Sequence, residues 1–284
     1  MRASRIGLGL AATALAAVTC FAPTAGAQEG RDDGRKRQVT ELLKSIETGD
    51  PKPVAVINPK KYTQHNLAVA DGLEGFGALL KQLPPNSAKV NTVRAFRDGD
   101  FVFTHTDYDF FGPKVGFDVF RFEDGKVVEH WDNLAEKAKE PNRSGHTQTD
   151  GPTEAKDLDK TEANKTLVRA FYEDILMKGK KEKLADYFGD TYIQHSPGLG
   201  DGVEGFSRLV GMVATPNSPI KFDKIHKVLG EGNFVLVMSE GAFRGKPSAF
   251  YDLFRVEGGK VVEHWDAIEA IPPKSERKND NGKF

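Results

Sequence analysis

The sequence "DVFRFEDGKVVEHWD" at residues 118–132 returns at residues 252–266 as "DLFRVEGGKVVEHWD". Each stretch alternates apolar and polar residues on both sides of a glycine-containing turn, which is typical of a β-hairpin. Two more pairs match in the same order. "YTQHNLAVADGLEGF" at 62–76 matches "YIQHSPGLGDGVEGF" at 192–206, and "GDFVFTH" at 99–105 matches "GNFVLVM" at 232–238. Ordered matches at a nearly constant spacing predict a duplicated domain.

The repeat and the composition divide the chain. We expect a first domain at residues 36–136 and a second at 161–271, each of a common domain size. Residues 137–160 between them are polar, contain Gly and Pro, and lack apolar periodicity, which favours a flexible linker. Residues 272–284 have the same character and are predicted to form a disordered tail.

The first 27 residues have the pattern of a secretory signal peptide. Positive residues precede an apolar run at 6–18, and "AGA" at 25–27 predicts cleavage after Ala27, hence a secreted or periplasmic protein. We expect no membrane span, because the apolar run is too short to cross a bilayer. Lipoprotein processing at Cys20 stays open as an alternative, although a threonine stands where a small residue is preferred directly before the cysteine.

Composition excludes several classes of function. The formal net charge is −1 and no basic stripe is present, so we expect no nucleic-acid partner. The only cysteine, Cys20, precedes the predicted cleavage site, so the mature chain has no thiol for a disulfide or for nucleophilic catalysis. Glycine-rich phosphate loops and the G-x-S-x-G motif of serine hydrolases are also missing from the sequence.

Each copy has helical periodicity first and strand periodicity afterwards. Apolar residues recur three and four positions apart at the start of the first copy, at Val39, Leu42, Leu43 and Ile46, and of the second, at Leu167, Val168, Phe171, Tyr172, Ile175 and Leu176. Alternating segments follow in the first copy at 90–96, 101–108, 116–122 and 126–132, with counterparts in the second. Helices followed by antiparallel strands predict an α+β fold.

The length of the hairpin turn decides which side chains share a face. We favour a three-residue loop with Gly125 in the left-handed region, which places Asp118, His130 and Asp132 together on one face. A two-residue turn would shift the register by one and separate Asp118 from Asp132. The same reasoning predicts a second cluster of Asp252, His264 and Asp266.

Two carboxylates and an imidazole are costly on an apolar face unless they are paired or border a wet cavity. They are also the groups that general acid–base catalysis uses, since burial and neighbouring charges move their pKa values toward neutrality. A solvated, salt-bridged rim is the alternative for both clusters. Further candidates are His65 and His195, each in a Tyr-x-Gln-His pattern, with loop histidines bonded to backbone as the alternative.

His105 is a candidate of the first copy alone, because its counterpart in the second is Met238. We expect it on a strand, on the same face as Phe103. The ligand types of His65, His105, His130 and Asp132 suit zinc, but their spacing matches no metal-binding motif, so we expect no metal. His146 lies in the linker.

The linked motifs "QH…DGVEGF", "GNFVLV" and "DLFRVEGGKVVEHWD", with their first-copy counterparts, resemble the SnoaL-like, polyketide cyclase-like branch of the nuclear transport factor 2-like superfamily. The resemblance implies two tandem cone-shaped α+β barrels, each a curved antiparallel sheet wrapped around N-terminal helices with a pocket at its mouth. It also implies pairing through sheet faces, which two copies in one chain can satisfy as an intramolecular pseudo-dimer.

Polyketide cyclases of this family move protons with an acidic residue and a nearby histidine, without a metal or an organic cofactor. By motif position the resemblance implies Asp132 and Asp266 as acid–base residues, supported by His130, His264, Asp118, Asp252, His65, His195 and, in the first copy, His105. We therefore expect an exported protein that binds a small, partly apolar molecule in each domain, with aldol-type cyclisation or isomerisation as the chemistry. A noncatalytic ligand-binding or protein-interaction module is the alternative.

Overall fold

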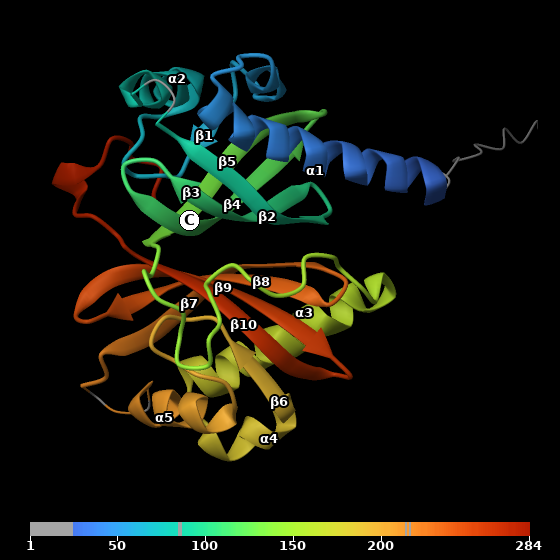
Figure 1. The fold of residues 1–284 in the computed structure, drawn as a ribbon, viewed down its shortest axis with the longest axis vertical. Helices are drawn as coiled ribbons and strands as arrows, with labels where there is room; N and C mark the ends of the chain where they lie inside the picture. The colour runs from blue at the N-terminus through green and yellow to red at the C-terminus, as the bar shows by residue number, and fades with distance from the viewer. Residues whose placement is uncertain (1–24, 85–86, 214, 216) are drawn as a thin grey trace, which may run out of the picture.

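A computed structural model describes residues 25–84, 87–213, 215 and 217–284 (Figure 1). The signal peptide predicted at 1–27 therefore lies almost wholly outside the described residues. Within the described part of the chain, no helix combines the length and the apolar character that crossing a membrane requires.

Each repeat contains one five-stranded sheet, and the two sheets have the same topology. Their strand orders are β1-β5-β4-β3-β2 and β6-β10-β9-β8-β7. The short first strand of each sheet runs parallel to the last, and the remaining pairs are antiparallel. The strands are β1 (Thr63–Gln64), β2 (Lys89–Asp98), β3 (Phe101–Asp109), β4 (Pro113–Glu123), β5 (Lys126–Glu136), β6 (Phe188–Gln194), β7 (Ile220–Glu231), β8 (Phe234–Phe243), β9 (Lys246–Glu257) and β10 (Lys260–Ala270).

Helices cover one face of each sheet, so the predicted α+β class is confirmed (Figure 1). The first domain has α1 (Ala25–Thr48), the 3₁₀ turn η1 (Pro53–Val56) and α2 (Gly72–Gln82). The second domain has α3 (Thr161–Phe171), which continues as the π-helix η3 (Tyr172–Met177), then α4 (Leu184–Tyr187) and α5 (Val203–Val213). Short 3₁₀ turns complete the described helices: η2 (Leu158–Lys160), η4 (Lys181–Lys183) and η5 (Lys274–Glu276).

The faces of the two sheets that are free of helices pack against each other (Figure 1). Aromatic rings of Phe96 and Phe234 stack there with centroids 4.5 Å apart. The side chain of Asn133 donates hydrogen bonds to the carbonyls of Ala249 and Ala267, across the contact. Trp131 and Trp265 are buried in the same core. The two domains therefore share one hydrophobic core between their sheets.

The last hairpin has the predicted register, although its turn differs from the prediction. Asp118 pairs with Asp132, as expected. The turn has two residues, Asp124 and Gly125, both with positive φ, which is the geometry of a type I′ turn. A β-bulge at Val128 inserts one extra residue beside this turn and restores the pairing. The second domain repeats the two-residue turn and the bulge.

The linker and the tail differ from the expectation of flexibility and disorder. In the linker, Asn142 donates a hydrogen bond from Nδ2 to the carbonyl of Gln194 in the second domain. In the tail, Asn281 donates from Nδ2 to the carbonyl of Gln64 in the first domain, 3.0 Å away. Each segment therefore crosses from the last strand of its own domain to the end of the first strand of the other domain. Backbone and amide contacts hold these segments, and apolar periodicity does not reveal such contacts.

Candidate active site

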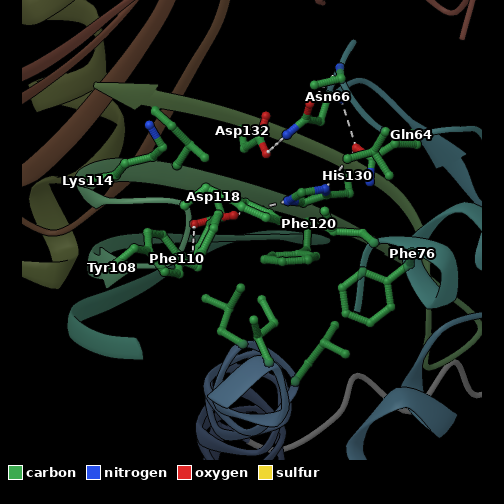
Figure 2. A pocket seen from close by; sticks show the side chains of 18 of the residues that line it. Gln64, Asn66, Phe76, Tyr108, Phe110, Lys114, Asp118, Phe120, His130 and Asp132 are labelled. Atoms are coloured by element: carbon green, nitrogen blue, oxygen red, sulfur yellow. Dashed lines mark hydrogen bonds and ion pairs between the residues drawn. The ribbon is translucent and has the colours of Figure 1, made fainter. Parts of the chain in front are cut away.

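A cavity of about 320 Å³ lies in the first domain, between the sheet and the helices that cover it (Figure 2). Its walls are mostly apolar. Leu42, Leu43 and Ile46 of α1 border it at helical spacing, and Phe76 of α2 borders it on another side. The remaining wall of the cavity is polar and is formed by the inner face of the sheet.

Three of the predicted residues lie together on that polar wall (Figure 2). Asp118, His130 and Asp132 are each no more than 8% exposed. Nε2 of His130 lies 3.2 Å from Oδ1 of Asp118. Tyr108 on β3 donates a hydrogen bond from its hydroxyl to Oδ2 of Asp118, over 2.6 Å. The register of β3, β4 and β5 therefore brings a carboxylate, an imidazole and a phenol into one network.

Gln64 fixes a proton on Nδ1 of His130. The backbone N–H of Asn66 donates to Oε1 of Gln64 at 2.8 Å, so this oxygen is an acceptor. Nδ1 of His130 lies 3.0 Å from the same oxygen and must therefore carry a proton. Nε2 then faces Asp118 with one proton between them. This arrangement can give up and take back a proton at the cavity wall.

Asp132 keeps one carboxylate oxygen free of hydrogen bonds. Its Oδ2 accepts from Nδ2 of Asn66 at 2.6 Å. Its Oδ1 is buried and has no hydrogen-bond partner among the described residues, although Nζ of Lys283 lies 3.7 Å away. Lys283 also pairs with Glu269 of the second domain, at 2.5 Å. Burial raises the pKa of Glu269, an effect that Lys283 opposes.

The phenol groups of the site stay protonated at neutral pH. Burial, together with nearby Asp118, raises the pKa of Tyr108 well above its ordinary value. Burial also raises the pKa of Tyr62, and the carboxylates of Asp132 and Asp118 add to this effect. Both hydroxyls therefore keep their protons, and that of Tyr108 is donated to Asp118.

The second domain contains the same polar cluster. Nε2 of His264 lies 2.9 Å from Oδ1 of Asp252, and Nδ1 lies 3.0 Å from Oε1 of Gln194. Ser196 donates from its hydroxyl to Asp266 over 2.7 Å. Burial raises the pKa of Asp266. The duplicated sequence therefore builds the carboxylate–histidine arrangement twice.

Residues 168–264 match the family model of the SnoaL-like domain. This segment is a SnoaL-like domain. Solved structures with similarity to the chain include TsrD from Streptomyces laurentii, with 20% identity over 36% of this chain and 88% of the other, at a TM-score of 0.32. Others are an epoxide hydrolase from M. tuberculosis that resembles LEH (18% identity, 37% and 85%, TM-score 0.32) and an NTF-2-like protein from Burkholderia xenovorans LB400 (17%, 39% and 91%, TM-score 0.34). No curated protein matches the chain.

In the SnoaL-like domain at 168–264, the tyrosine that bonds the buried aspartate comes from a different element than in the first domain. Tyr172, fully buried, reaches in from the helix and donates to Oδ2 of Asp252 at 2.8 Å. In the aligned repeat, Tyr172 matches Leu43, and Tyr108 of the first domain matches Gly241. A Cβ at Gly241 would lie 1.8 Å from the carbonyl oxygen of Lys221, so no side chain fits there. The same hydrogen bond to the aspartate is thus supplied from a strand in one domain and from a helix in the other.

Aromatic side chains pack the interior of the SnoaL-like domain where the first domain has its cavity. Besides Tyr172, they are Phe171, Phe222 and Phe250, all at most 6% exposed, at positions where the first domain has Leu42, Val90 and Gly116. The sequence predicts a similar pocket in each domain. In the structure, side chains occupy the part of the second domain that corresponds to the cavity of the first. The periodic residues of the helix had indicated burial without showing that they would fill the site.

Three predicted site residues point away from the polar clusters. His65 stacks on Trp131, with centroids 4.8 Å apart, and its Nε2 lies 3.0 Å from Glu129. His195 stacks in the same way on Trp265. Because side chains alternate along a strand, Gln64 and Asn66 face the cavity and His65 faces the other side. The alternation within the Tyr-x-Gln-His pattern was a signal for Gln64 that the sequence analysis missed.

His105 also lies on the sheet face opposite the cavity. Its ring stacks on Phe117 at 4.3 Å, and Nδ1 lies 2.9 Å from a guanidinium nitrogen of Arg94. Burial, with Arg94 and His195 nearby, lowers the pKa of His105 well below its ordinary value. The set of His65, His105, His130 and Asp132 considered for zinc is therefore divided between two faces. The ligand atoms of Asp118, His130 and Asp132 lie within 4.8 Å of one another and could hold a cation in the cavity.

Proposed function

We propose that the first domain binds a small, partly apolar molecule and catalyses proton transfer without a cofactor, as in aldol-type cyclisation or isomerisation. The observation that carries this proposal is the buried, unbonded Oδ1 of Asp132 beside the His130–Asp118 pair, at the polar wall of an otherwise apolar cavity. Such a wall gives a base and a proton donor with low solvent competition. The SnoaL-like family supports a small-molecule-binding or catalytic role.

In the proposed reaction, Oδ1 of Asp132 takes a proton from a carbon next to a substrate carbonyl. The electron pair of that C–H bond moves into an enolate, whose oxygen shares the proton held between Nε2 of His130 and Asp118. The enolate carbon then attacks a second carbonyl to close a ring, or is reprotonated at another position. Asp132 returns its proton to the product, so no external acid, base or oxidant is consumed.

We also propose that the two domains act as an intramolecular pseudo-dimer in which one domain completes the site of the other. The shared sheet-face core supports this arrangement. Glu269 of the second domain borders the cavity of the first, and accepts a hydrogen bond from the backbone N–H of Leu134 at 3.2 Å. Lys283 of the tail approaches Asp132. The second domain and the tail that follows it therefore place charged groups beside the cavity.

Export is a further part of the proposal, supported by the sequence pattern of residues 1–27. Expression of the full chain in a secreting bacterial host, followed by N-terminal sequencing, tests it. A mature chain that begins at Gln28 supports cleavage after Ala27. A chain that begins at Cys20 with a lipid modification would show lipoprotein processing, and an intact Met1 would contradict export.

The catalytic proposal is tested with Asp132→Asn and its matched control in the other repeat, Asp266→Asn. A thermal-shift screen of small apolar carbonyl compounds identifies ligands, and wild-type turnover of those ligands is then measured. We expect Asp132→Asn to reduce turnover about 10²- to 10⁴-fold while ligand binding is kept, and Asp266→Asn to leave turnover near wild type. Undiminished turnover by Asp132→Asn would contradict the assignment. Ligands that bind but are never converted by the wild type would support the noncatalytic binding module.

A further inference from the structure

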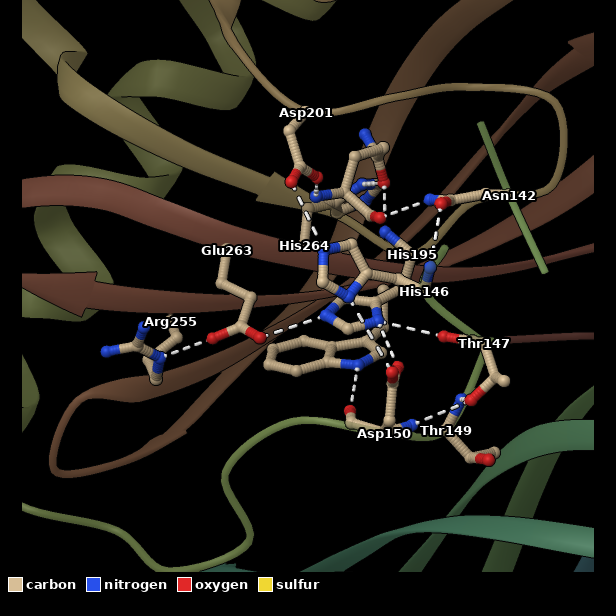
Figure 3. Close-up of polar contacts among 12 residues, drawn as sticks. Asn142, His146, Thr147, Thr149, Asp150, His195, Asp201, Arg255, Glu263 and His264 are labelled. Carbon is tan, nitrogen blue, oxygen red and sulfur yellow. Dashed lines mark hydrogen bonds and ion pairs between the residues drawn. The ribbon is translucent and has the colours of Figure 1, made fainter. Parts of the chain in front are cut away.

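A second group of metal-ligating side chains lies outside the cavity, where the linker crosses the SnoaL-like domain (Figure 3). His146 and Asp150 come from the linker, and His195 follows β6. Nδ1 of His195 lies 2.7 Å from Oδ1 of Asp150, and Nδ1 of His146 lies 3.6 Å from Oδ2 of the same carboxylate. We propose that these three residues bind one zinc ion, which joins the linker to the second domain.

The other nitrogen of each imidazole already has a carboxylate partner. Nε2 of His146 lies 3.1 Å from Oδ2 of Asp201, and Nε2 of His195 lies 2.9 Å from Oε1 of Glu263. Glu263 is itself held by Nε of Arg255, at 2.6 Å. Histidines that bind metals commonly donate their second N–H to a carboxylate, which fixes the tautomer and leaves the facing nitrogen free for the ion. Both histidines of this group have that arrangement, and both present Nδ1 to the same point.

The backbone around the third ligand is also held in place. The carbonyl of Asp150 accepts hydrogen bonds from Nε1 of Trp265 at 3.0 Å and from the guanidinium of Arg94 at 2.9 Å. Trp265 in turn stacks on His195, with ring centroids 4.6 Å apart. The backbone of Asp150 is thus anchored by residues of both domains beside a buried histidine, which limits the rearrangement that binding requires.

An ion can reach this group from solvent. The side chains of His146 and Asp150 are 30% and 43% exposed, whereas that of His195 is 1% exposed. A cavity of about 120 Å³ adjoins the group and is lined by His146, Thr147 and His195. The carbonyl oxygen of Thr147 lies 2.8 Å from Nδ1 of His195, where the ion would displace the proton that bonds to it. The cavity leaves room for a water molecule as a fourth ligand.

The charges and ligand types favour a divalent ion of the zinc type. Glu263 is neutralised by Arg255, so Asp150 and Asp201 leave two negative charges around two neutral imidazoles. Two imidazoles and one carboxylate suit zinc, whose bonds of about 2.0–2.1 Å place tetrahedral ligand atoms about 3.3 Å apart. The three ligand atoms already lie within 4.8 Å of one another, so small side-chain rotations close the site. Two protonated histidines would balance the same charge, and this is the competing explanation.

The first domain provides an internal control, because His65 has the surroundings of His195 without the same ligands. His65 stacks on a tryptophan, contacts Glu129 through Nε2, and has a backbone carbonyl, that of Gly282, 2.9 Å from Nδ1. This carbonyl of Gly282 corresponds to that of Thr147, and the residue before it is Asn281 in the tail and His146 in the linker. Asn281 donates from Nδ2 to Asp71 at 2.7 Å, as His146 contacts the matching Asp201. An asparagine in place of the histidine removes the second imidazole ligand.

The test is a titration of the purified, chelator-treated chain with zinc chloride, followed by calorimetry and by competition with a chromophoric chelator. We expect one zinc ion per wild-type chain, and cobalt substitution should give the visible absorption of a tetrahedral nitrogen–oxygen site. His146→Ala and Asp150→Asn change side chains that are partly exposed and should lower the affinity at least about tenfold, whereas His65→Ala should keep it. Asp201→Asn should weaken binding about 10- to 100-fold through the position of His146.

Three outcomes would overturn the assignment. One is the absence of zinc binding by the folded wild type, which would favour two protonated histidines. Another is binding that His146→Ala and Asp150→Asn leave unchanged. The third is binding that is lost in Asp132→Asn but kept in His146→Ala, which would place the ion in the cavity of the first domain. Circular dichroism of each variant shows whether a lost signal reflects unfolding, and cobalt spectra of the folded variants then decide.

Discussion

Leu43 of α1 and Tyr172 of η3 stand at equivalent positions of the two repeats, and the difference in their size accompanies the difference between the two interiors. Leu43 borders the cavity of about 320 Å³. Tyr172 fills the corresponding space and hydrogen-bonds Asp252 and Ser239. One repeat therefore keeps an open site, while the other keeps the same polar cluster inside a packed core.

The first prediction is that Leu43→Phe closes the cavity. The phenyl ring can extend into the cavity, so we expect the free energy of unfolding to change by less than the 1–3 kcal/mol typical of overpacking in a filled core. Ligands found by thermal shift should bind at least about tenfold more weakly, because their space is occupied. Leu43→Met conserves volume and is the control. Wild-type affinity in Leu43→Phe, measured by calorimetry, would show that ligands bind elsewhere.

A second prediction compares Tyr108→Phe with Tyr172→Phe. Each change removes a buried hydroxyl that donates to an aspartate, and each should lower the free energy of unfolding by about 1–3 kcal/mol in urea denaturation. The effects on turnover should differ. Tyr108→Phe should shift the pH profile of turnover, because Asp118 loses a donor beside His130, whereas Tyr172→Phe should leave the profile unchanged. Equal shifts in both variants would contradict a single working site.

The sequence predicted the site where strand alternation determined it. Asp118, His130 and Asp132 meet because side chains on antiparallel strands alternate every two residues, and they meet although the turn has one residue fewer than predicted. The bulge at Val128 compensated for the shorter turn. The residues of the turn and the burial of one strand face both constrain the register, and burial is the stronger constraint.

Other parts of the site could not be read from periodicity. Tyr108 and Tyr172 reach the aspartates from different elements, so aligning the repeats does not reveal their common role. His65 had the residue type of a catalytic group, but its place in the alternation directs it away from the cavity. The ordered linker and the tail are held by asparagine side chains and backbone groups, and their polar composition resembles that of flexible segments.

A third prediction concerns the pH dependence of stability through His105. Burial, with Arg94 and His195 nearby, lowers its pKa well below the ordinary value, so the folded state holds it neutral. As the pH falls below about 6.5, the unfolded chain binds a proton that the folded chain does not, and stability is lost. His105→Met copies the residue at the equivalent Met238 and removes this loss. We expect wild type to lose about 1 kcal/mol relative to the variant between pH 6.5 and pH 5.5 in urea unfolding. A difference that stays constant with pH would contradict a neutral buried His105.

The fourth prediction concerns Lys283, which lies between Asp132 and Glu269 and is 3% exposed in its side chain. Lys283→Met leaves two buried or half-buried carboxylates without their cation, which should cost about 2 kcal/mol at neutral pH. The pKa of Glu269, raised by burial and lowered by Lys283, should rise further. A carboxyl whose folded pKa is raised loses stability as the pH increases above its unfolded value of about 4.3. The deficit of the variant should therefore be smallest near pH 4 and grow toward neutrality in urea denaturation.

Lys278→Met changes an exposed side chain of the same tail and should stay within about 0.5 kcal/mol of wild type. An equal loss in both variants would show that the tail is held by its backbone contacts and that Lys283 contributes no specific charge to the cavity rim.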